Sequence, residues 1–276
     1  MSSRYLIRDV LKDITHILNP VIDRASREAQ LLLMHYLSVD EIWLLMNQNS
    51  YIDDVEKLFE MVQRRAKNEP LEYITQKVSF YSQEFYIAKG ALIPRPETEL
   101  LIDEVVKNIP DKNAKLTFVE VGVGSGIISV MLAKKFPFAK IIAVDISKDA
   151  IEIAKINIKK FELQDRIELR CGSLLEPVDE EFDYLVSNPP YIANNAKLDS
   201  NLSYEPQNAL FGGDEGDEII KKLLDEVLNR KINFFTCEMG YDQKDKIHNY
   251  LSTKSPVKLE FYKDLSSFDR GFTVRL

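Results

Sequence analysis

Residues 116–276 alternate short β-branched and aromatic runs with stretches of helical periodicity, and this alternation constrains the fold most strongly. It favours a mostly parallel sheet with helices on both faces and ligands at the carboxyl ends of the strands. The last two runs are joined by too short a connection for a helical crossover, which predicts an antiparallel final strand. The expected strands are Leu116–Val121, Lys140–Asp145, Arg166–Cys171, Tyr184–Ser187, Asn233–Glu238, Val257–Tyr262 and Phe272–Leu276, and the expected helices cover 126–135, 148–160, 215–230 and 243–252.

The first 70 residues follow a different pattern, with helical periodicity and no strand alternation. Apolar residues recur there at steps of three and four, as in Leu11, Ile14 and Leu18. Asp40 is placed to cap a helix, and Pro70 is expected to stop the last helix of the group. We therefore expect a small helical bundle, with residues 1–76 forming an N-terminal domain.

A change to aromatic and β-branched residues broken by polar pairs predicts a β-hairpin over residues 77–94, with its turn near Ser82-Gln83. A helix is then expected to run to about Lys107, because proline and acidic residues favour a first helical turn. Residues 95–276 are expected to form the larger α/β domain.

Composition limits the classes of partner. The chain has 276 residues, 45% hydrophobic and 29% charged, as in ordinary globular proteins. No apolar run approaches the roughly 20 residues of a membrane helix, and the first residues lack the pattern of a signal peptide. We therefore expect a cytoplasmic protein with no membrane partner. The net charge is −8 and acids outnumber bases in residues 1–85, so no direct nucleic-acid partner is expected.

Metal ligation is not expected either. Cys171 and Cys237 end runs typical of buried strands and have no partner at metal-ligand spacing, so we interpret both as reduced core thiols. The acidic stretch 214–218 is interpreted as the start of a helix, where acids are favourable.

A glycine-rich loop follows the first strand of the larger domain. Gly122, Gly124 and Gly126 permit a tight turn and a close approach of a ligand to the backbone, and the next helix offers free N–H groups. The second strand ends in Asp145, nineteen residues beyond Gly126, where a carboxylate can accept both hydroxyls of a ribose. This order favours a nucleoside-containing cofactor over a plain structural turn.

The tetrapeptide Asn188-Pro189-Pro190-Tyr191 ends the fourth strand. Two prolines restrict the loop, so that the Asn188 side chain and the Pro189 carbonyl can act as neighbouring acceptors for a flat –NH2 group. Tyr191 can lie against the same planar group. A simple turn is the structural alternative, and it is less favoured at this position beside a cofactor loop.

Together, residues 120–126, Asp145 and residues 188–191 resemble class I S-adenosylmethionine-dependent amino-methyltransferases. Other stretches narrow the resemblance to the release factor glutamine methyltransferase family (HemK/PrmC). It covers essentially the whole chain, and rests on Pro70-Leu71-Glu72-Tyr73-Ile74, Leu92-Ile93-Pro94-Arg95-Pro96-Glu97-Thr98-Glu99, Tyr204-Glu205-Pro206 and Gly212-Gly213.

The resemblance implies a Rossmann-like domain joined to a helical domain by the hairpin. It also implies N5-methylation of the glutamine in the Gly-Gly-Gln motif of class 1 release factors, with S-adenosylmethionine as cofactor, S-adenosylhomocysteine as product and no metal. The implied cofactor residues are Glu120, Gly122, Val123, Gly124, Ser125, Gly126, Asp145, Leu174 and Asn188, and the implied substrate residues are Arg95, Glu97, Asn188, Pro189, Pro190 and Tyr191, the last four also catalytic.

Three residues depart from the family pattern. Glu120 and Val123 replace the usual Asp and a small or hydroxyl residue, and Ser173 replaces an acid that often ends the third strand. Two other functions remain open at this point. A nucleic-acid adenine or cytosine amino-methyltransferase shares the tetrapeptide but lacks support from the charge, and a degenerate binding module is disfavoured by the intact glycine loop.

Overall fold

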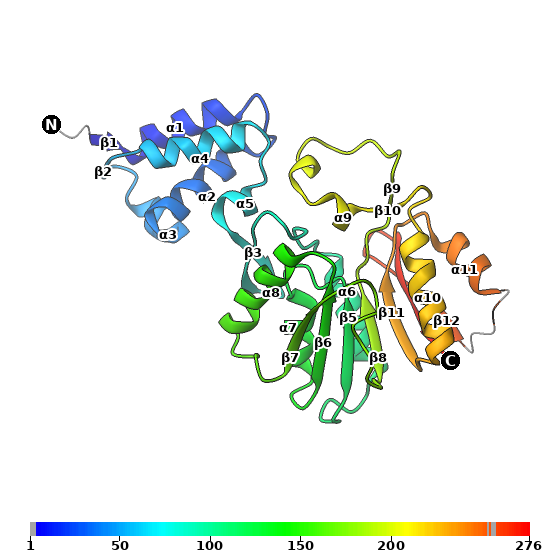
Figure 1. The fold of residues 1–276 in the computed structure, drawn as a ribbon. Helices are drawn as coiled ribbons and strands as arrows, with labels where there is room; N and C mark the ends of the chain where they lie inside the picture. Colours follow the sequence, from blue (N-terminus) through cyan, green and yellow to red (C-terminus); the bar gives the residue numbers. More distant parts are fainter. Residues whose placement is uncertain (1–3, 253, 255–257) are drawn as a thin grey trace. The chain divides into compact units, whose positions relative to one another are not determined.

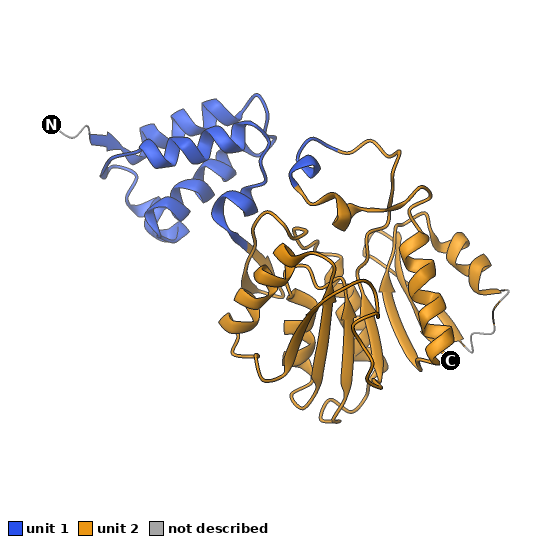
Figure 2. Cartoon of the chain, viewed as in Figure 1, with its two compact units in different colours: residues 1–77, 199–204 blue, residues 78–198, 205–276 orange. Residues whose placement is uncertain are grey.

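The computed structural model describes residues 4–252, 254 and 258–276; Val257, the expected start of one strand, lies outside them. The chain forms two compact units (Figure 2). The first unit contains residues 1–77 and 199–204, and the second contains residues 78–198 and 205–276. No helix within the described part of the chain is both long and apolar enough to cross a membrane.

The first unit is a bundle of helices around one core, as the periodicity predicted. Ile7, Ile14 and Leu18 of α1 pack with Leu33 and Leu58 of the neighbouring helices, and all five are fully buried. The prediction of no strands was wrong, because β1 and β2 pair in a short antiparallel ladder. The elements are β1 (Arg4–Leu6), α1 (Ile7–Leu18), α2 (Ala25–Leu37), α3 (Glu41–Met46), β2 (Tyr51–Asp53), α4 (Glu56–Ala66), α5 (Leu71–Thr75) and the 3-10 turn η1 (Leu202–Tyr204).

Two predicted helix boundaries in this unit have different outcomes. The Asp40 side chain accepts a hydrogen bond from the Trp43 N–H at 2.7 Å, which confirms the N-cap. Pro70 does not end the last helix, because α4 has already ended at Ala66 and Pro70 instead precedes α5. Proline suits this position since its missing N–H is not needed at a helix start.

The second unit is built on a seven-stranded sheet of order β12-β13-β11-β8-β5-β6-β7 (Figure 1). β13 pairs antiparallel with both β11 and β12, whereas β11, β8, β5, β6 and β7 pair in parallel, so the antiparallel final strand is confirmed. The strands are β5 (Thr117–Val121), β6 (Lys140–Asp145), β7 (Ile167–Cys171), β8 (Tyr184–Ser187), β11 (Phe234–Glu238), β12 (Lys258–Lys263) and β13 (Asp269–Arg275).

Successive residues of the central strands point to opposite faces of the sheet, and each face has its own core. Phe118 and Ile141 pack under α6, α7 and α8, whereas Val119 and Ile142 pack under α10 and α11. Both faces are therefore covered, which explains why these strands are nearly continuous apolar runs. The helices are α6 (Thr98–Asn108), α7 (Ile127–Lys135), α8 (Lys148–Lys160), α9 (Gln207–Leu210), α10 (Glu218–Arg230) and α11 (Lys244–Ser252), and a small parallel pair is formed by β9 (Ile192–Ala193) and β10 (Phe211–Gly213).

The predicted hairpin forms from β3 (Lys77–Phe80) and β4 (Gln83–Tyr86), so it ends at Tyr86 and not at residue 94. Its two turn residues, Tyr81 and Ser82, both have positive φ, as a tight two-residue turn requires. Asn157 of α8 ties this hairpin to the glycine-rich loop. Its fully buried amide accepts from Tyr86 N–H and donates to the carbonyl oxygens of Tyr86 and Ser125, each at 2.8 Å. One side chain thus fixes the hairpin and the glycine-rich loop together.

Candidate active site

A cavity of about 350 Å³ opens at the carboxyl ends of β5, β6 and β8, where an α/β sheet binds its ligands. It is lined by the glycine loop, by the ends of these strands, by the segment before α6 and by residues of α9 and α10. Most lining side chains are apolar, and the polar groups include Thr98, Asp145, Asn188 and Asn208. Such a surface suits a small-molecule ligand that is oriented by a few hydrogen bonds.

The glycine loop depends on backbone conformations that other residues rarely adopt. Gly122 follows β5 with a φ of 81°, and its N–H and that of Val123 both donate to the Val144 carbonyl, at 2.8 and 3.0 Å. Gly126 caps α7 with a φ of 80°, and a Cβ on it would lie 3.1 Å from the Cβ of Ala154. The loop therefore lies close against β6 and α8, and its outer side faces the cavity.

Asp145 ends β6 at the rim of the cavity. Its Oδ2 accepts from the Gly124 N–H at 2.9 Å and its Oδ1 accepts from the Ser147 N–H at 2.8 Å. A carboxylate offers about four lone-pair positions, so two remain for a ligand. Burial raises the pKa of Asp145, and the backbone N–H bonds oppose that rise.

Glu120 has a different environment from Asp145, although both were assigned to the cofactor. It is fully buried within β5 and does not line the cavity. Ser129 donates a short hydrogen bond to its Oε2, and Oε1 has no partner among the described residues. Burial raises the pKa of Glu120 to about 8. Glu120 therefore joins β5 to α7 behind the cavity, and its raised pKa favours the protonated form.

Asn188 lies at the other end of the cavity, directly after β8. Its Nδ2 donates to the Thr98 Oγ1 at 3.1 Å, and Thr98 is 3% exposed at the start of α6. Pro189 and Pro190 line the cavity beside it. The amide is thus held by a contact ninety residues away in the sequence.

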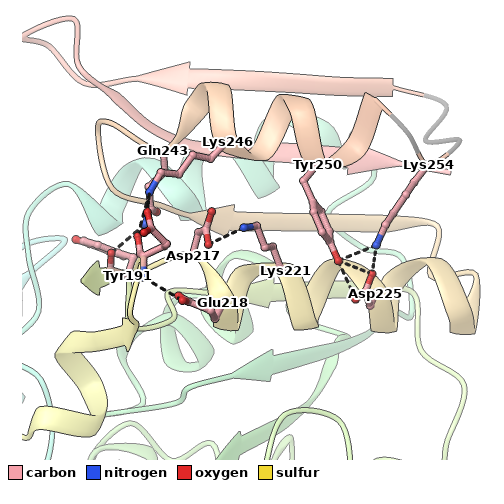
Figure 3. A network of polar contacts seen from close by, with 10 residues as sticks. Tyr191, Asp217, Glu218, Lys221, Asp225, Gln243, Lys246, Tyr250 and Lys254 are labelled. Atoms are coloured by element: carbon pink, nitrogen blue, oxygen red, sulfur yellow. Dashed lines mark hydrogen bonds and ion pairs between the residues drawn. The ribbon is translucent and has the colours of Figure 1, made fainter. Parts of the chain in front are cut away.

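Tyr191 is fixed by three contacts that place its ring outside the cavity lining. Its hydroxyl donates to Glu238 Oε1 at 3.3 Å. Its carbonyl accepts from Gln243 Nε2 at 3.0 Å (Figure 3). Gln243 in turn accepts from the Gly240 N–H at 2.9 Å. The ring packs against the core under α10 and α11. In this structure Tyr191 therefore supports the loop from behind.

Arg95 and Glu97 also lie outside the cavity lining. The Arg95 guanidinium pairs with Glu205 Oε1 at 2.6 Å and donates to the Ile93 carbonyl at 2.8 Å, while Glu205 Oε2 accepts from the Ile93 N–H at 2.9 Å. Glu205 is 5% exposed. This closed set of bonds holds the segment before α6 to the segment before α9, and the Tyr-Glu-Pro sequence supplies its acid.

The structure thus brings most of the predicted site residues to one cavity. Lining residues are Gly122, Val123, Gly124, Ser125, Asp145, Leu174, Asn188, Pro189 and Pro190, whereas Glu120, Gly126, Tyr191, Arg95 and Glu97 are not part of the lining. Sequence reasoning missed Thr98, Asn208 and Phe211. Thr98 lies within the Arg-Pro-Glu-Thr-Glu motif, which was its only signal. Asn208 and Phe211 follow the Tyr-Glu-Pro motif, and no local pattern marked them.

The acidic stretch 214–218 contains the start of α10, although that helix begins at Glu218 and not at 215. Two of its acids form ion pairs. Lys221 pairs with Asp217 at 2.9 Å (Figure 3), and Lys246 pairs with Glu215 at 3.0 Å. Across the described residues, no group of three or more His, Cys, Asp or Glu side chains is arranged to hold a metal ion.

Both cysteines are free, as expected, but only Cys237 is buried. The prediction was wrong for Cys171, which is exposed at the end of β7. β7 is the edge strand of the sheet, so its last side chain is not covered.

The strand order, the glycine turn after β5, the acid after β6 and the Asn-Pro-Pro-Tyr loop after β8 define a Rossmann-like methyltransferase. Residues 96–210 match the family described as Methyltransferase small domain, and residues 9–75 match the PrmC N-terminal domain. Among solved structures, the human Mettl16 catalytic domain in complex with a MAT2A 3′UTR hairpin has a TM-score of 0.58 at 12% identity, covering 82% of this chain and 84% of that one. This likeness shows the fold.

Curated relatives extend the match to the whole chain. A release factor glutamine methyltransferase of Dictyoglomus turgidum is 41% identical over 264 residues, covering 93% of each chain. Another of that name from Clostridium acetobutylicum is 34% identical over 277 residues, covering 96% of each. The chain belongs to the release factor glutamine methyltransferase family.

Proposed function

We propose that this protein transfers a methyl group from S-adenosylmethionine to the side-chain amide nitrogen, N5, of the glutamine in the Gly-Gly-Gln motif of class 1 peptide chain release factors. The names of the relatives give the substrate class. The observation that carries the proposal is the position of the Asn188 amide. It is held by Thr98 and lines, with Pro189, the same cavity as Asp145. We also place the reaction in the cytoplasm, where release factors act.

The cavity fits the proposed cofactor. The two free lone-pair positions of Asp145 can accept the ribose hydroxyls, and the outer side of the glycine loop leaves room for the methionine part, because a Cβ at Gly124 would meet nothing within 4 Å. Leu174 lines the cavity and can pack on the adenine ring, although Ser173 offers no carboxylate for the adenine amino group. Bound there, S-adenosylmethionine supplies an electrophilic methyl group with a good leaving group, and the proposed reaction uses no metal.

The side-chain amide nitrogen of the substrate glutamine is a poor nucleophile. Its lone pair is delocalised into the carbonyl, so the nitrogen must be oriented and its growing positive charge stabilised. Asn188 Oδ1 and the Pro189 carbonyl are the acceptors that we assign to the two hydrogens of the –NH2 group. Their hydrogen bonds strengthen as charge develops, which favours the transition state over the bound substrate.

A glutamine side chain is too small and too common to select one protein. We therefore assign residues 1–76 to docking of the release factor, residues 77–94 to a hairpin linker and residues 95–276 to catalysis. The match of residues 9–75 to the PrmC N-terminal domain supports this division. On α3 of the first unit, Ile42, Leu45 and Met46 are 69%, 59% and 81% exposed, which offers apolar surface to a protein partner.

Mass spectrometry tests the activity directly. A class 1 release factor is incubated with the protein and S-adenosylmethionine, and its Gly-Gly-Gln peptide is expected to gain the mass of one methyl group on the glutamine. A release factor with that glutamine changed to glutamate is the control, because it lacks the amide nitrogen. Methylation of DNA or RNA in preference to the unaltered release factor would contradict the proposal and favour the nucleic-acid alternative.

A further inference from the structure

The side chain of Asn188 must present its oxygen, not its nitrogen, to an incoming –NH2 group. An asparagine amide can be rotated by half a turn with little change in shape, and the rotated form would point donors at donors. Something must therefore select one orientation. The only described hydrogen-bond partner of the Asn188 side chain is the Thr98 hydroxyl, 3.1 Å from Nδ2.

The structure directs the nitrogen of the Asn188 side chain, and not its oxygen, toward Thr98. Asn188 Nδ2 donates to Thr98 Oγ1, and Thr98 is only 3% exposed, so water has little access to replace this contact. With Nδ2 engaged by Thr98, Oδ1 is left to accept from the substrate.

We propose that Thr98 is a positioning residue that holds the Asn188 amide in the orientation in which Oδ1 accepts from the substrate. This inference rests on the proposed function and adds a hydroxyl of the cavity lining that acts through Asn188. The contact joins the first residue of α6 to the residue after β8, ninety positions apart in the sequence.

Replacing Thr98 by valine tests the inference, because valine keeps the shape of threonine and removes the hydroxyl. The Asn188 amide then loses its selecting acceptor. We expect kcat on a class 1 release factor to fall about ten- to hundredfold, the scale for losing a buried hydrogen bond. KM should change less than about threefold, which corresponds to less than 1 kcal/mol. The affinity for S-adenosylhomocysteine, measured by calorimetry, should change equally little.

Three further variants separate positioning from stability. Thr98→Ser restores the hydroxyl and should recover most of kcat. Thr236→Val removes a buried hydroxyl from the same strand as Glu238, but this hydroxyl bonds Thr273 at 3.2 Å, so kcat should stay near that of the parent. If Thr98→Val does not fold, Thr98→Ala removes the hydroxyl without adding a methyl group in its place and gives the same comparison.

Two outcomes would count against different claims. Parental kcat in Thr98→Val, or a serine variant as slow as the valine variant, would overturn the positioning role while leaving the proposed function intact. Absence of glutamine methylation by the parent protein would overturn the proposed function, and this inference with it. A slow valine variant, a restored serine variant and an active Thr236→Val variant together would support the inference.

Discussion

The two ends of the cavity are built in different ways. The Asp145 end comes from one continuous stretch, β5, the glycine loop, α7 and β6, and uses backbone N–H groups with a single carboxylate. The Asn188 end joins Thr98, the first residue of α6, to Asn188, the residue after β8. The first end can bind a ligand through local conformation alone. The second end depends on the packing of the whole sheet, so the two ends should respond differently to substitution.

The largest expected effect is on turnover at the Asn188 end. Asn188→Ala removes one of the two proposed acceptors, so kcat should fall roughly 10²–10³-fold, the scale for removing one preorganised polar group. Affinity for S-adenosylhomocysteine should persist, since the glycine loop and Asp145 are unchanged. Steady-state kinetics and calorimetry measure the two quantities. Asn194→Ala is a matched control, because Asn194 is exposed and bonds Asp214 outside the cavity. Near-normal turnover in Asn188→Ala would place activation of the nitrogen elsewhere.

The second effect belongs to the Asp145 end and concerns binding. Asp145→Ala should weaken S-adenosylmethionine binding by about 1–3 kcal/mol, because ribose hydroxyls lose a charged partner. Calorimetry measures the change. Asp183→Ala is the control. Asp183 likewise accepts a hydrogen bond from a backbone N–H, that of Thr117 at 2.7 Å, but Thr117 is the first residue of β5, at the end of the strand away from the glycine loop. Unchanged affinity in Asp145→Ala, with NADH bound by the parent, would refute the cofactor assignment.

A third test asks whether the two ends of the cavity together explain substrate choice. Changing Ile42, Leu45 and Met46 to glutamate should lower kcat/KM on an intact release factor about tenfold, as expected if roughly 1.4 kcal/mol of docking energy is lost. A short Gly-Gly-Gln peptide should react as before. Ile156→Glu, on the exposed side of α8, is the control. Equal losses on protein and peptide would favour a purely stabilising role for the first unit.

The smallest expected effect is on the pH dependence of stability, which two buried acids influence. Burial raises the folded-state pKa of Glu120 to about 8 and of Glu238 to about 7, whereas unfolded glutamates titrate near their usual 4.5. The folded state therefore holds more protons between these values, and its stability falls as pH rises through them. One such acid contributes a slope of at most about 1.4 kcal/mol per pH unit.

Glu120→Gln should make that slope shallower between pH 5 and 8, because glutamine cannot titrate. Urea unfolding followed by circular dichroism at several pH values measures the slope. Glu152→Gln, which changes an exposed glutamate on α8, should leave it unaltered. Parallel curves for Glu120→Gln and the parent would show that Glu120 does not titrate abnormally.

Local patterns predicted much of the molecule. Periodicity gave the seven strands, the antiparallel last strand and the main helices, because each of these elements buries a face with its own repeat. Predictions failed where a short element or an edge decided the outcome. β1 and β2 are only three residues each, and Cys171 is exposed because β7 has no neighbour beyond it.

The sequence by itself determined the glycine turn, the position of Asp145 and the Asn-Pro-Pro-Tyr loop, since each follows from residues close together in the chain. Only the tertiary structure decided that Arg95 is engaged by Glu205, that Tyr191 lies behind the loop, and that Asn157 joins the hairpin to Ser125. The physical reason is that a buried polar group must find a partner wherever packing brings one within reach. Such partners come from distant segments, and no local pattern encodes them.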